Sequence, residues 1–126
     1  MKSIKVNKGI KYRIYPTAKQ VELINNTFGC VRFVYNHMLA ESIDTYAKGE
    51  NFASRNAFNY RLTSLKKEYA WLCNVDSTAL QGANDYLADA FSRFFKKQND
   101  FPVFHKKKHD GSYTSKCVNK SIRLEN

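Results

Sequence analysis

The sequence lacks the stretches that would place a protein in a membrane or direct it out of the cell. It has no run of 18 apolar residues, so no transmembrane helix is predicted. The opening stretch, MKSIKVNKGIKYRIYP, carries positive charge but neither an apolar core nor a cleavage site, so it does not resemble a signal peptide. No expected helix combines a basic face with an apolar one, which disfavours binding to a membrane surface. We therefore expect a cytoplasmic protein.

Cysteine is too scarce and too scattered for a disulfide framework or a cysteine-rich zinc site. The three cysteines are far apart and none belongs to a C-x-x-C pair: they are Cys30, Cys73 and Cys117. His105 and His109 have the spacing of metal ligands, but the three lysines between them would repel a dication. We therefore expect reduced thiols and no bound metal.

The sequence also lacks a self-contained catalytic site. It contains no Ser-His-Asp arrangement and no glycine-rich phosphate loop. Its helical aspartates have simpler explanations than metal binding. Asp76 precedes an expected helix as its N-cap, and Asp85 and Asp89 form a solvated row at helical spacing. No cofactor is expected.

What the sequence does contain is an apolar, aromatic body with basic ends. Hydrophobic residues make up 43%, and nine Phe, eight Tyr and one Trp are present, which suits the core of one 126-residue domain. Residues 1–20 contain six basic and no acidic residues, residues 21–92 six basic and eight acidic, and residues 93–126 nine basic and three acidic. If the two ends meet in the fold, they form one anion-binding surface, whereas scattered surface lysines would only aid solubility. We favour the first interpretation.

Aromatic residues alternate with lysine and arginine in these basic ends, which is typical of surfaces that contact phosphates and stack on bases. The expected contact residues of this kind are Lys11, Arg13, Lys106, Lys107, Lys108, Tyr113 and Lys116.

Periodicity predicts a strand followed by a long helix at the N-terminal end. Residues 4–15 alternate apolar and basic side chains, which indicates a half-buried strand. Thr17 and Gln20 have capping-box spacing and begin a helix expected over residues 17–48. Gly29 allows either a turn or close packing, but no other turn residue adjoins it, so we expect a continuous or slightly kinked helix.

Two more helices and a basic return segment complete the expected order. The helices are expected over residues 54–70 and 77–97, and residues 101–126 combine a basic connection with short strands. The fold class expected is therefore mainly α with flanking β (α+β).

Three stretches resemble, in order and at matching spacing, the N-terminal region of the OrfB/TnpB proteins of bacterial insertion sequences. They are KYRIYPTAKQVELINNTFGCVRFVYNHMLAE, VDSTALQGANDYLADAFSRFF and FPVFHKKKHDGSYT, and the similarity covers nearly the whole chain. The resemblance implies a relationship to RNA-guided DNA endonucleases, which are in turn related to the type V CRISPR effectors. It also implies that residues 1–16 supply the first strand of a small barrel, the wedge domain. Residues 17–100 would form an inserted three-helix recognition lobe, and residues 101–126 would return to an incomplete barrel.

The resemblance also implies which residues approach nucleic acid. In such proteins the V-D-x-x-A-L-Q segment at the start of the third helix lies near the DNA, which here gives Gln81, Ser77 and Thr78. Gln81 is the strongest of these because an amide can bond a base edge. The next candidate after Gln81 is Asn119, which belongs to the strand expected after the basic connection.

The function implied is a nucleic-acid-binding N-terminal part of a TnpB-like transposase, with guide RNA and double-stranded DNA as partners. The family's catalytic carboxylates and zinc element lie beyond the end of this sequence, so the resemblance implies that this chain does not cut DNA. Two alternatives remain: a free-standing regulator that binds the element's RNA or end DNA, and a truncated remnant that binds by charge alone. An open edge strand of the incomplete barrel would favour self-association.

Overall fold

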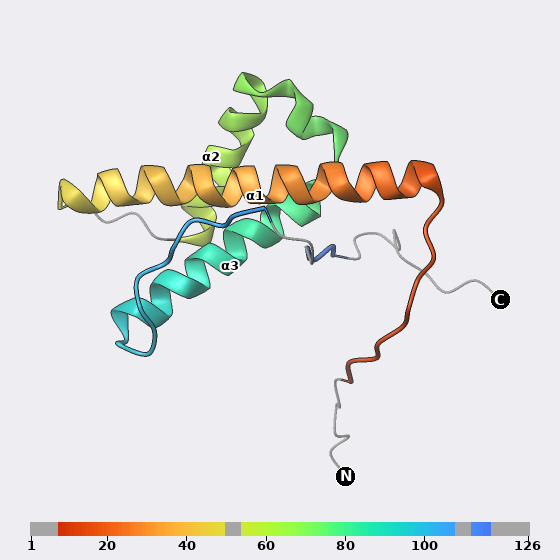
Figure 1. Cartoon of the computed structure of the whole chain (residues 1–126). Coiled ribbons are helices and arrows are strands. Elements are labelled where there is room, and N and C mark those ends of the chain that lie inside the picture. Colours follow the sequence, from red (N-terminus) through yellow and green to blue (C-terminus); the bar gives the residue numbers. More distant parts are fainter. Residues whose placement is uncertain (1–7, 50–53, 108–111, 117–126) are drawn as a thin grey trace, which may run out of the picture.

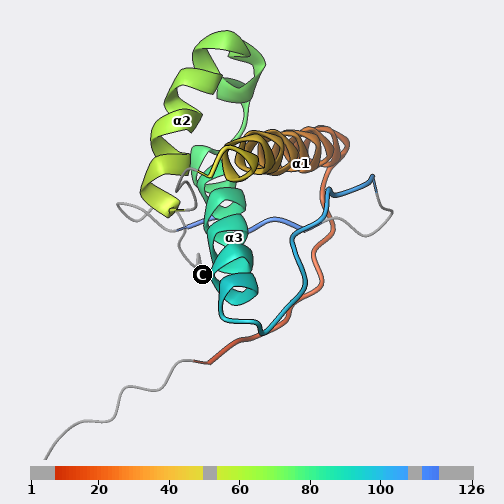
Figure 2. The same ribbon diagram turned by 90° about the vertical axis from the view of Figure 1, so that its left-hand side faces the viewer.

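The computed structural model describes residues 8–49, 54–107 and 112–116. In chain order the elements are α1 (Ala18–Ala47), α2 (Arg55–Glu68), the short 3-10 helix η1 (Ala70–Asn74) and α3 (Ser77–Phe95). Figure 1 shows α3 crossing below the long helix α1, with α2 rising beside both. Figure 2 looks nearly along α1 and shows the same order, so the three helices meet around one central region.

Polar side chains begin each helix. The Thr17 hydroxyl accepts a hydrogen bond from the Gln20 backbone N–H, and the Gln20 side chain accepts one from the Thr17 N–H. Ser54 caps α2 and Asp76 caps α3 in the same way, each accepting a backbone N–H of the first turn. The expected capping box and the expected role of Asp76 are therefore confirmed.

Helix α1 runs through Gly29 without interruption, as expected. A Cβ at Gly29 would meet no atom within 4 Å, so this glycine marks neither a turn nor a close contact. Gly49, directly after the helix, has a φ of 75°, a left-handed conformation that suits a glycine at the end of a helix.

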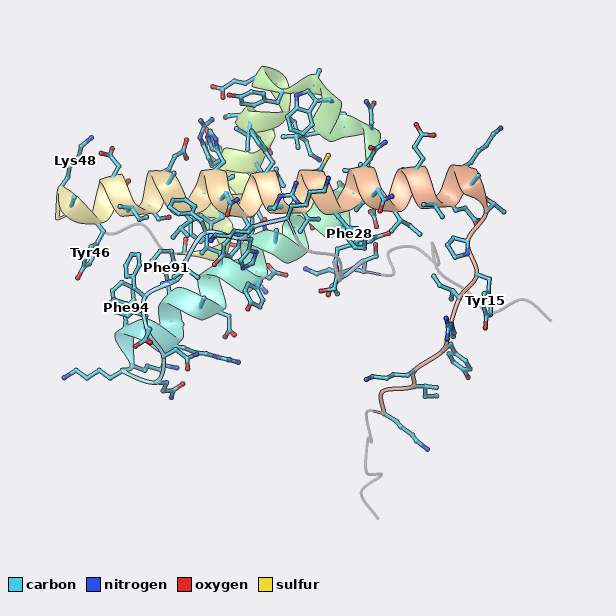
Figure 3. The ribbon with its side chains drawn as sticks, in the orientation of Figure 1. Tyr15, Phe28, Tyr46, Lys48, Phe91 and Phe94 are labelled. Carbon is cyan, nitrogen blue, oxygen red and sulfur yellow. The ribbon has the colours of Figure 1, made fainter. Side chains whose placement is uncertain are left out.

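The core lies where one face of each helix converges. Val34, Leu39, Leu72, Leu80 and Leu87 are fully buried, and burying each of these side chains contributes about 1.5–3 kcal/mol. An aromatic cluster lies near the end of α3, with Phe91 fully buried and Tyr46 and Phe95 about half exposed. Its members are Tyr46, Phe91, Phe94, Phe95 and Phe101, which form ring contacts with one another. Figure 3 shows Tyr46 extending from α1 toward Phe91 and Phe94 of α3.

The expectation of an α+β fold is wrong, because every regular element of the described residues is a helix and none is a strand. Residues 8–16, which include the described part of the expected first strand, form no regular element and are exposed. They leave the start of α1 and run away from the helices, as the position of Tyr15 in Figure 3 shows. Residues 112–116 also lack strand structure, and the remaining residues expected to be strands lie outside the described part.

The barrel and its open edge therefore have no counterpart in the described part of the chain. The physical reason is that period-two alternation predicts an extended backbone but not a partner. A strand exists only where a second segment accepts its hydrogen bonds. Among the helices of the described residues, none combines the length and the apolar character needed to cross a membrane.

Candidate nucleic-acid interface

The segment after α3 returns to α1 and is held there by two adjacent side chains. The Asn36 amide donates to the His105 carbonyl (2.9 Å) and accepts from the His105 N–H (2.8 Å). The Tyr35 hydroxyl donates to the Val103 carbonyl at 3.1 Å. The Tyr35 ring also stacks on the His105 imidazole, with centroids 3.7 Å apart and planes 4° apart. These contacts place residues 103–106 along α1.

The 112–116 segment lies over the start of α3. The Lys116 N–H donates to the Thr78 hydroxyl (3.1 Å), and the Lys116 ammonium lies 2.7 Å from Asp85. The Ser115 hydroxyl donates to the carboxylate of Asp76. Because the pair with Lys116 lies across two segments, Asp85 is part of a tertiary contact and not of a purely solvated row.

Gly82 allows this segment to approach the helix closely. A Cβ at Gly82 would lie 3.0 Å from the Thr114 carbonyl oxygen, which is closer than ordinary packing permits. A glycine inside a helix costs about 1 kcal/mol relative to alanine. At position 82 the glycine permits the close contact with Thr114, because any larger residue would require the backbone to shift.

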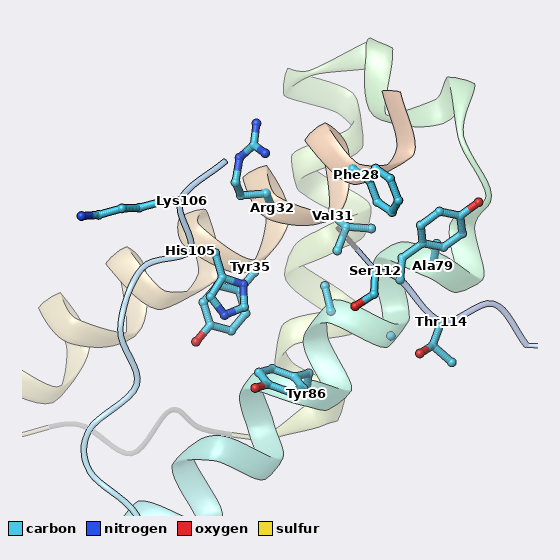
Figure 4. Close-up of a pocket in the computed structure, with 13 residues that line it drawn as sticks. Phe28, Val31, Arg32, Tyr35, Ala79, Tyr86, His105, Lys106, Ser112 and Thr114 are labelled. Carbon is cyan, nitrogen blue, oxygen red and sulfur yellow. The ribbon is translucent and has the colours of Figure 1, made fainter. Parts of the chain in front are cut away.

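A cleft of about 320 Å³ lies between α1, α3 and these two segments. Figure 4 shows Tyr35 and His105 on one side of it, Phe28 on the other, and α3 beneath. Its lining comprises Phe28, Val31, Arg32, Tyr35, Ala79, Gly82, Ala83, Tyr86, His105, Lys106, Ser112, Tyr113 and Thr114. Phe28 and Tyr113 meet edge to face at 5.4 Å, so α1 and the 112–116 segment together form one wall.

The structure brings some of the expected contact residues together around this cleft. Lys106 and Tyr113 line it, and Lys116 lies beside it on Thr78. The Thr78 hydroxyl is occupied within the chain, because it also bonds the Asp76 carboxylate. Ser77 is exposed on the first turn of α3.

The remaining expected contact residues are not part of the cleft. Gln81 is half-buried on the second turn of α3, and its amide forms no hydrogen bond with the described residues. Lys107 is exposed just beyond the cleft. Lys11 and Arg13 lie on the extended segment that runs away from the helices, and Arg13 contacts the Tyr15 ring there.

Four residues considered from sequence lie outside the described residues: Lys108, His109, Cys117 and Asn119. Within the described part, no group of three or more His, Cys, Asp or Glu side chains could hold a metal.

The lysines and arginines of the described residues fall into two sets, those with a carboxylate partner and those without one. Those of the first set pair with carboxylates of the helices: they are Lys48, Arg55, Arg61, Arg93 and Lys116. No carboxylate of the described residues pairs with the second set, which comprises Lys8, Lys11, Arg13, Lys19, Arg32, Lys66, Lys67, Lys96, Lys97, Lys106 and Lys107. Most of this second set lies in residues 8–19 and 96–107, the segments that flank the helices.

Local contacts shift the pKa values of groups near the site. Hydrogen bonds from Ser115 and Thr78 lower the pKa of Asp76, against a smaller opposing effect of burial. Burial raises the pKa of the Tyr35 hydroxyl, and nearby Tyr86 adds to this effect. Asp76 is therefore ionised, and Tyr35 neutral, at neutral pH.

Sequence reasoning missed the residues that build the cleft from α1. Asn36 and Phe28 have partners about 70 or more positions away along the chain, which no local pattern indicates. Arg32 lines the cleft. An Asn within a long helix is itself a weak signal, because Asn has poor helix propensity and needs a compensating bond. Gly82 is a second such signal.

Comparison with known proteins gives matches over most of the chain. A family model described as a helix-turn-helix domain matches residues 1–51. A putative RNA-guided DNA endonuclease of Streptomyces pristinaespiralis is 37% identical over 105 residues, which are 82% of this chain and 26% of that protein. Virulence protein VsdF of Salmonella dublin is 40% identical over 110 residues, 79% of this chain and 92% of that protein. Putative RNA-guided DNA endonuclease InsQ of Escherichia coli (strain K12) is 27% identical over 105 residues, again 82% and 26%.

This chain covers very different shares of its three relatives. The chain spans about a quarter of the length of the two endonuclease relatives and nearly all of VsdF. Within the described part of the family match, residues 8–49, the structure contains one uninterrupted helix, α1, and no second helix after a turn.

Proposed function

Because this chain belongs to the OrfB/TnpB family of insertion-sequence transposases, we propose that it is a nucleic-acid-binding module that contacts guide RNA and transposon-adjacent DNA. Two of its relatives are named as RNA-guided DNA endonucleases, and similarity to them covers 82% of the chain. We assign binding, and no cleavage step, to these residues.

The observation that carries this proposal is the distribution of unpaired cations. Within the described residues, the lysines and arginines that lack a carboxylate partner are concentrated in residues 8–19 and 96–107. A cation without a carboxylate partner can bind phosphate without first breaking an ion pair. Each such phosphate contact releases counterions from the nucleic acid, which favours binding at low salt.

Phosphate contacts position a protein, and base contacts specify the sequence. For specificity we propose Gln81, whose amide makes no hydrogen bond within the described chain, together with the neighbouring exposed Ser77. The Lys116 N–H donates to Thr78, which directly follows Ser77 in the first turn of α3. Nucleic acid at the start of α3 would therefore meet both α3 and this segment.

The test is binding measured by fluorescence anisotropy across a salt series. The ligands are the element's guide RNA, duplex DNA bearing the element's end, and scrambled versions of both. Replacing Lys106 and Lys107 by Ala should lower the slope of log K against log salt by about 0.7–0.9 for each phosphate that the variant no longer binds.

A matched control is the pair Lys66 and Lys67, which also lack an ion pair but lie on the last turn of α2. Changing them to Ala alters the net charge equally and should leave the slope unchanged. Equal slopes for the two double variants would contradict a localised phosphate surface.

One observation favours a second candidate, a free-standing regulator of the element. VsdF is a relative of which this chain covers 92%, so a protein of nearly this extent exists by itself. The regulator would prefer its own element's RNA or end DNA over scrambled sequences in the same assay. Equal affinity for all sequences, abolished by salt, would support binding by charge alone.

A further inference from the structure

The cleft between α1 and α3 is lined on its α3 side by small residues. They are Ala79, Gly82 and Ala83, so backbone and methyl groups form its floor. Its volume of about 320 Å³ is at the lower end of the range for small-ligand sites. It suits one ring system and is too small for a stacked base pair.

Aromatic rings stand around this floor. Tyr35 and His105 form a stacked pair on one side, and Phe28 with Tyr113 forms the other. Tyr86 lies near the first pair, with its ring centroid 5.9 Å from that of His105, and 61% of its surface is exposed. An exposed tyrosine beside an aromatic cleft provides a stacking surface that does not contribute to the core.

Polar and charged groups lie at the opening. Figure 4 shows the Ser112 and Thr114 hydroxyl groups on one side, and Arg32 and Lys106 extending outward from the rim. No carboxylate of the described residues pairs with Arg32, whereas Arg61 and Arg93 of the same helical body each have such a partner.

We propose that this cleft takes up one unstacked nucleobase of a single strand, with the phosphates beside that base on Arg32 and Lys106. The arrangement matches the chemistry of such sites, in which bases stack on aromatic rings and the backbone follows cationic groups. A duplex cannot supply the base, because its bases are stacked on both faces. This inference rests on the proposed nucleic-acid binding and specifies where a base enters.

The test separates base stacking from phosphate contact. Fluorescein-labelled 12-mers of oligo-dT, oligo-rU and an abasic strand with the same phosphates are titrated with the full chain. The variants are Tyr86→Ala, Tyr86→Phe and the control Tyr60→Ala, which removes an 81% exposed tyrosine from α2. Tyr86→Ala should weaken binding of the base-bearing strands by about fivefold to a hundredfold. Its effect on the abasic strand should be negligible, and Tyr86→Phe should bind like the unmodified chain.

Four outcomes overturn the proposal in distinguishable ways. If the unmodified chain binds none of these strands but binds guide RNA or duplex DNA in the salt-series assay, the base slot is refuted and the proposed function stands. If it binds neither these strands nor those ligands, both fail. If it binds but Tyr86→Ala behaves like Tyr60→Ala, only the slot is refuted. If Tyr86→Ala weakens binding of the abasic strand equally, the tyrosine acts on the backbone or the fold. A larger reduction on oligo-rU than on oligo-dT would identify the base as one from RNA, and the reverse would identify DNA.

Discussion

Replacing Asn36 by Ala should release the returning chain from α1 without unfolding the helices. Asn36 makes both hydrogen bonds to the backbone of His105, at 2.8 and 2.9 Å, from a half-buried position. Alanine supplies neither bond, and the His105 N–H would be left to water or to no partner. The Tyr35–His105 stack and the Tyr35–Val103 bond remain. The change therefore isolates the contribution of the amide.

The magnitude follows from these two bonds. Each net hydrogen bond contributes about 0.5–1.5 kcal/mol, so opening of residues 103–106 should become easier by about 2 kcal/mol. This corresponds to roughly thirtyfold faster hydrogen exchange at the His105 amide if exchange occurs through local opening. The global free energy of unfolding should fall by less, because the segment can detach while the helices stay packed, and alanine also has a higher helix propensity than asparagine.

The assay is hydrogen exchange resolved by residue, together with urea denaturation of the same samples. Asn26→Ala is the matched control, since Asn26 lies exposed on the same helix and gains the same propensity. An unchanged exchange rate of the His105 amide in Asn36→Ala would refute the reasoning. So would an equal acceleration in both variants.

Three further results are expected. Gly82→Ala should displace the 112–116 segment, because its Cβ would lie 3.0 Å from the Thr114 carbonyl; NMR shifts of that segment should change while the helical circular dichroism stays constant. The Ser115 hydrogen bond, one of those that lower the pKa of Asp76, should persist from neutral pH down to about 4 and break as pH falls through that lowered pKa. NMR shifts of the segment measure this change, and Asp76→Asn should abolish the pH dependence. Phe91→Ala, at a fully buried ring, should reduce the free energy of unfolding by about 3–5 kcal/mol, measured by urea denaturation.

Local features of the fold were predictable because the interactions that fix them span only a few residues. Thr17 and Gln20 satisfy each other three positions apart, and Asp76 caps the helix that follows it. The helical spacing of Leu80, Leu87 and Phe91 likewise depends on one turn at a time, and all three are buried.

The cleft and the absence of strands from the described residues were not predictable by the same means. The cleft depends on pairs such as Asn36 with His105 and Phe28 with Tyr113, and no local pattern states which of many possible partners will meet. The alternation around Tyr12 predicted a strand, but a strand also needs a neighbour. In the structure Tyr12 is 80% exposed.

The continuity of α1 has a consequence for how the length of this protein can vary in evolution. Phe28 contacts Tyr113 and Asn36 contacts His105, and the two positions on α1 are separated by about 12 Å of helix rise. One residue inserted or deleted between them would turn one contact by about 100° relative to the other. Insertions before Ile24, in the exposed first turns, would shift neither contact. Length changes among related sequences should therefore accumulate before Ile24 and be absent between the two contacts.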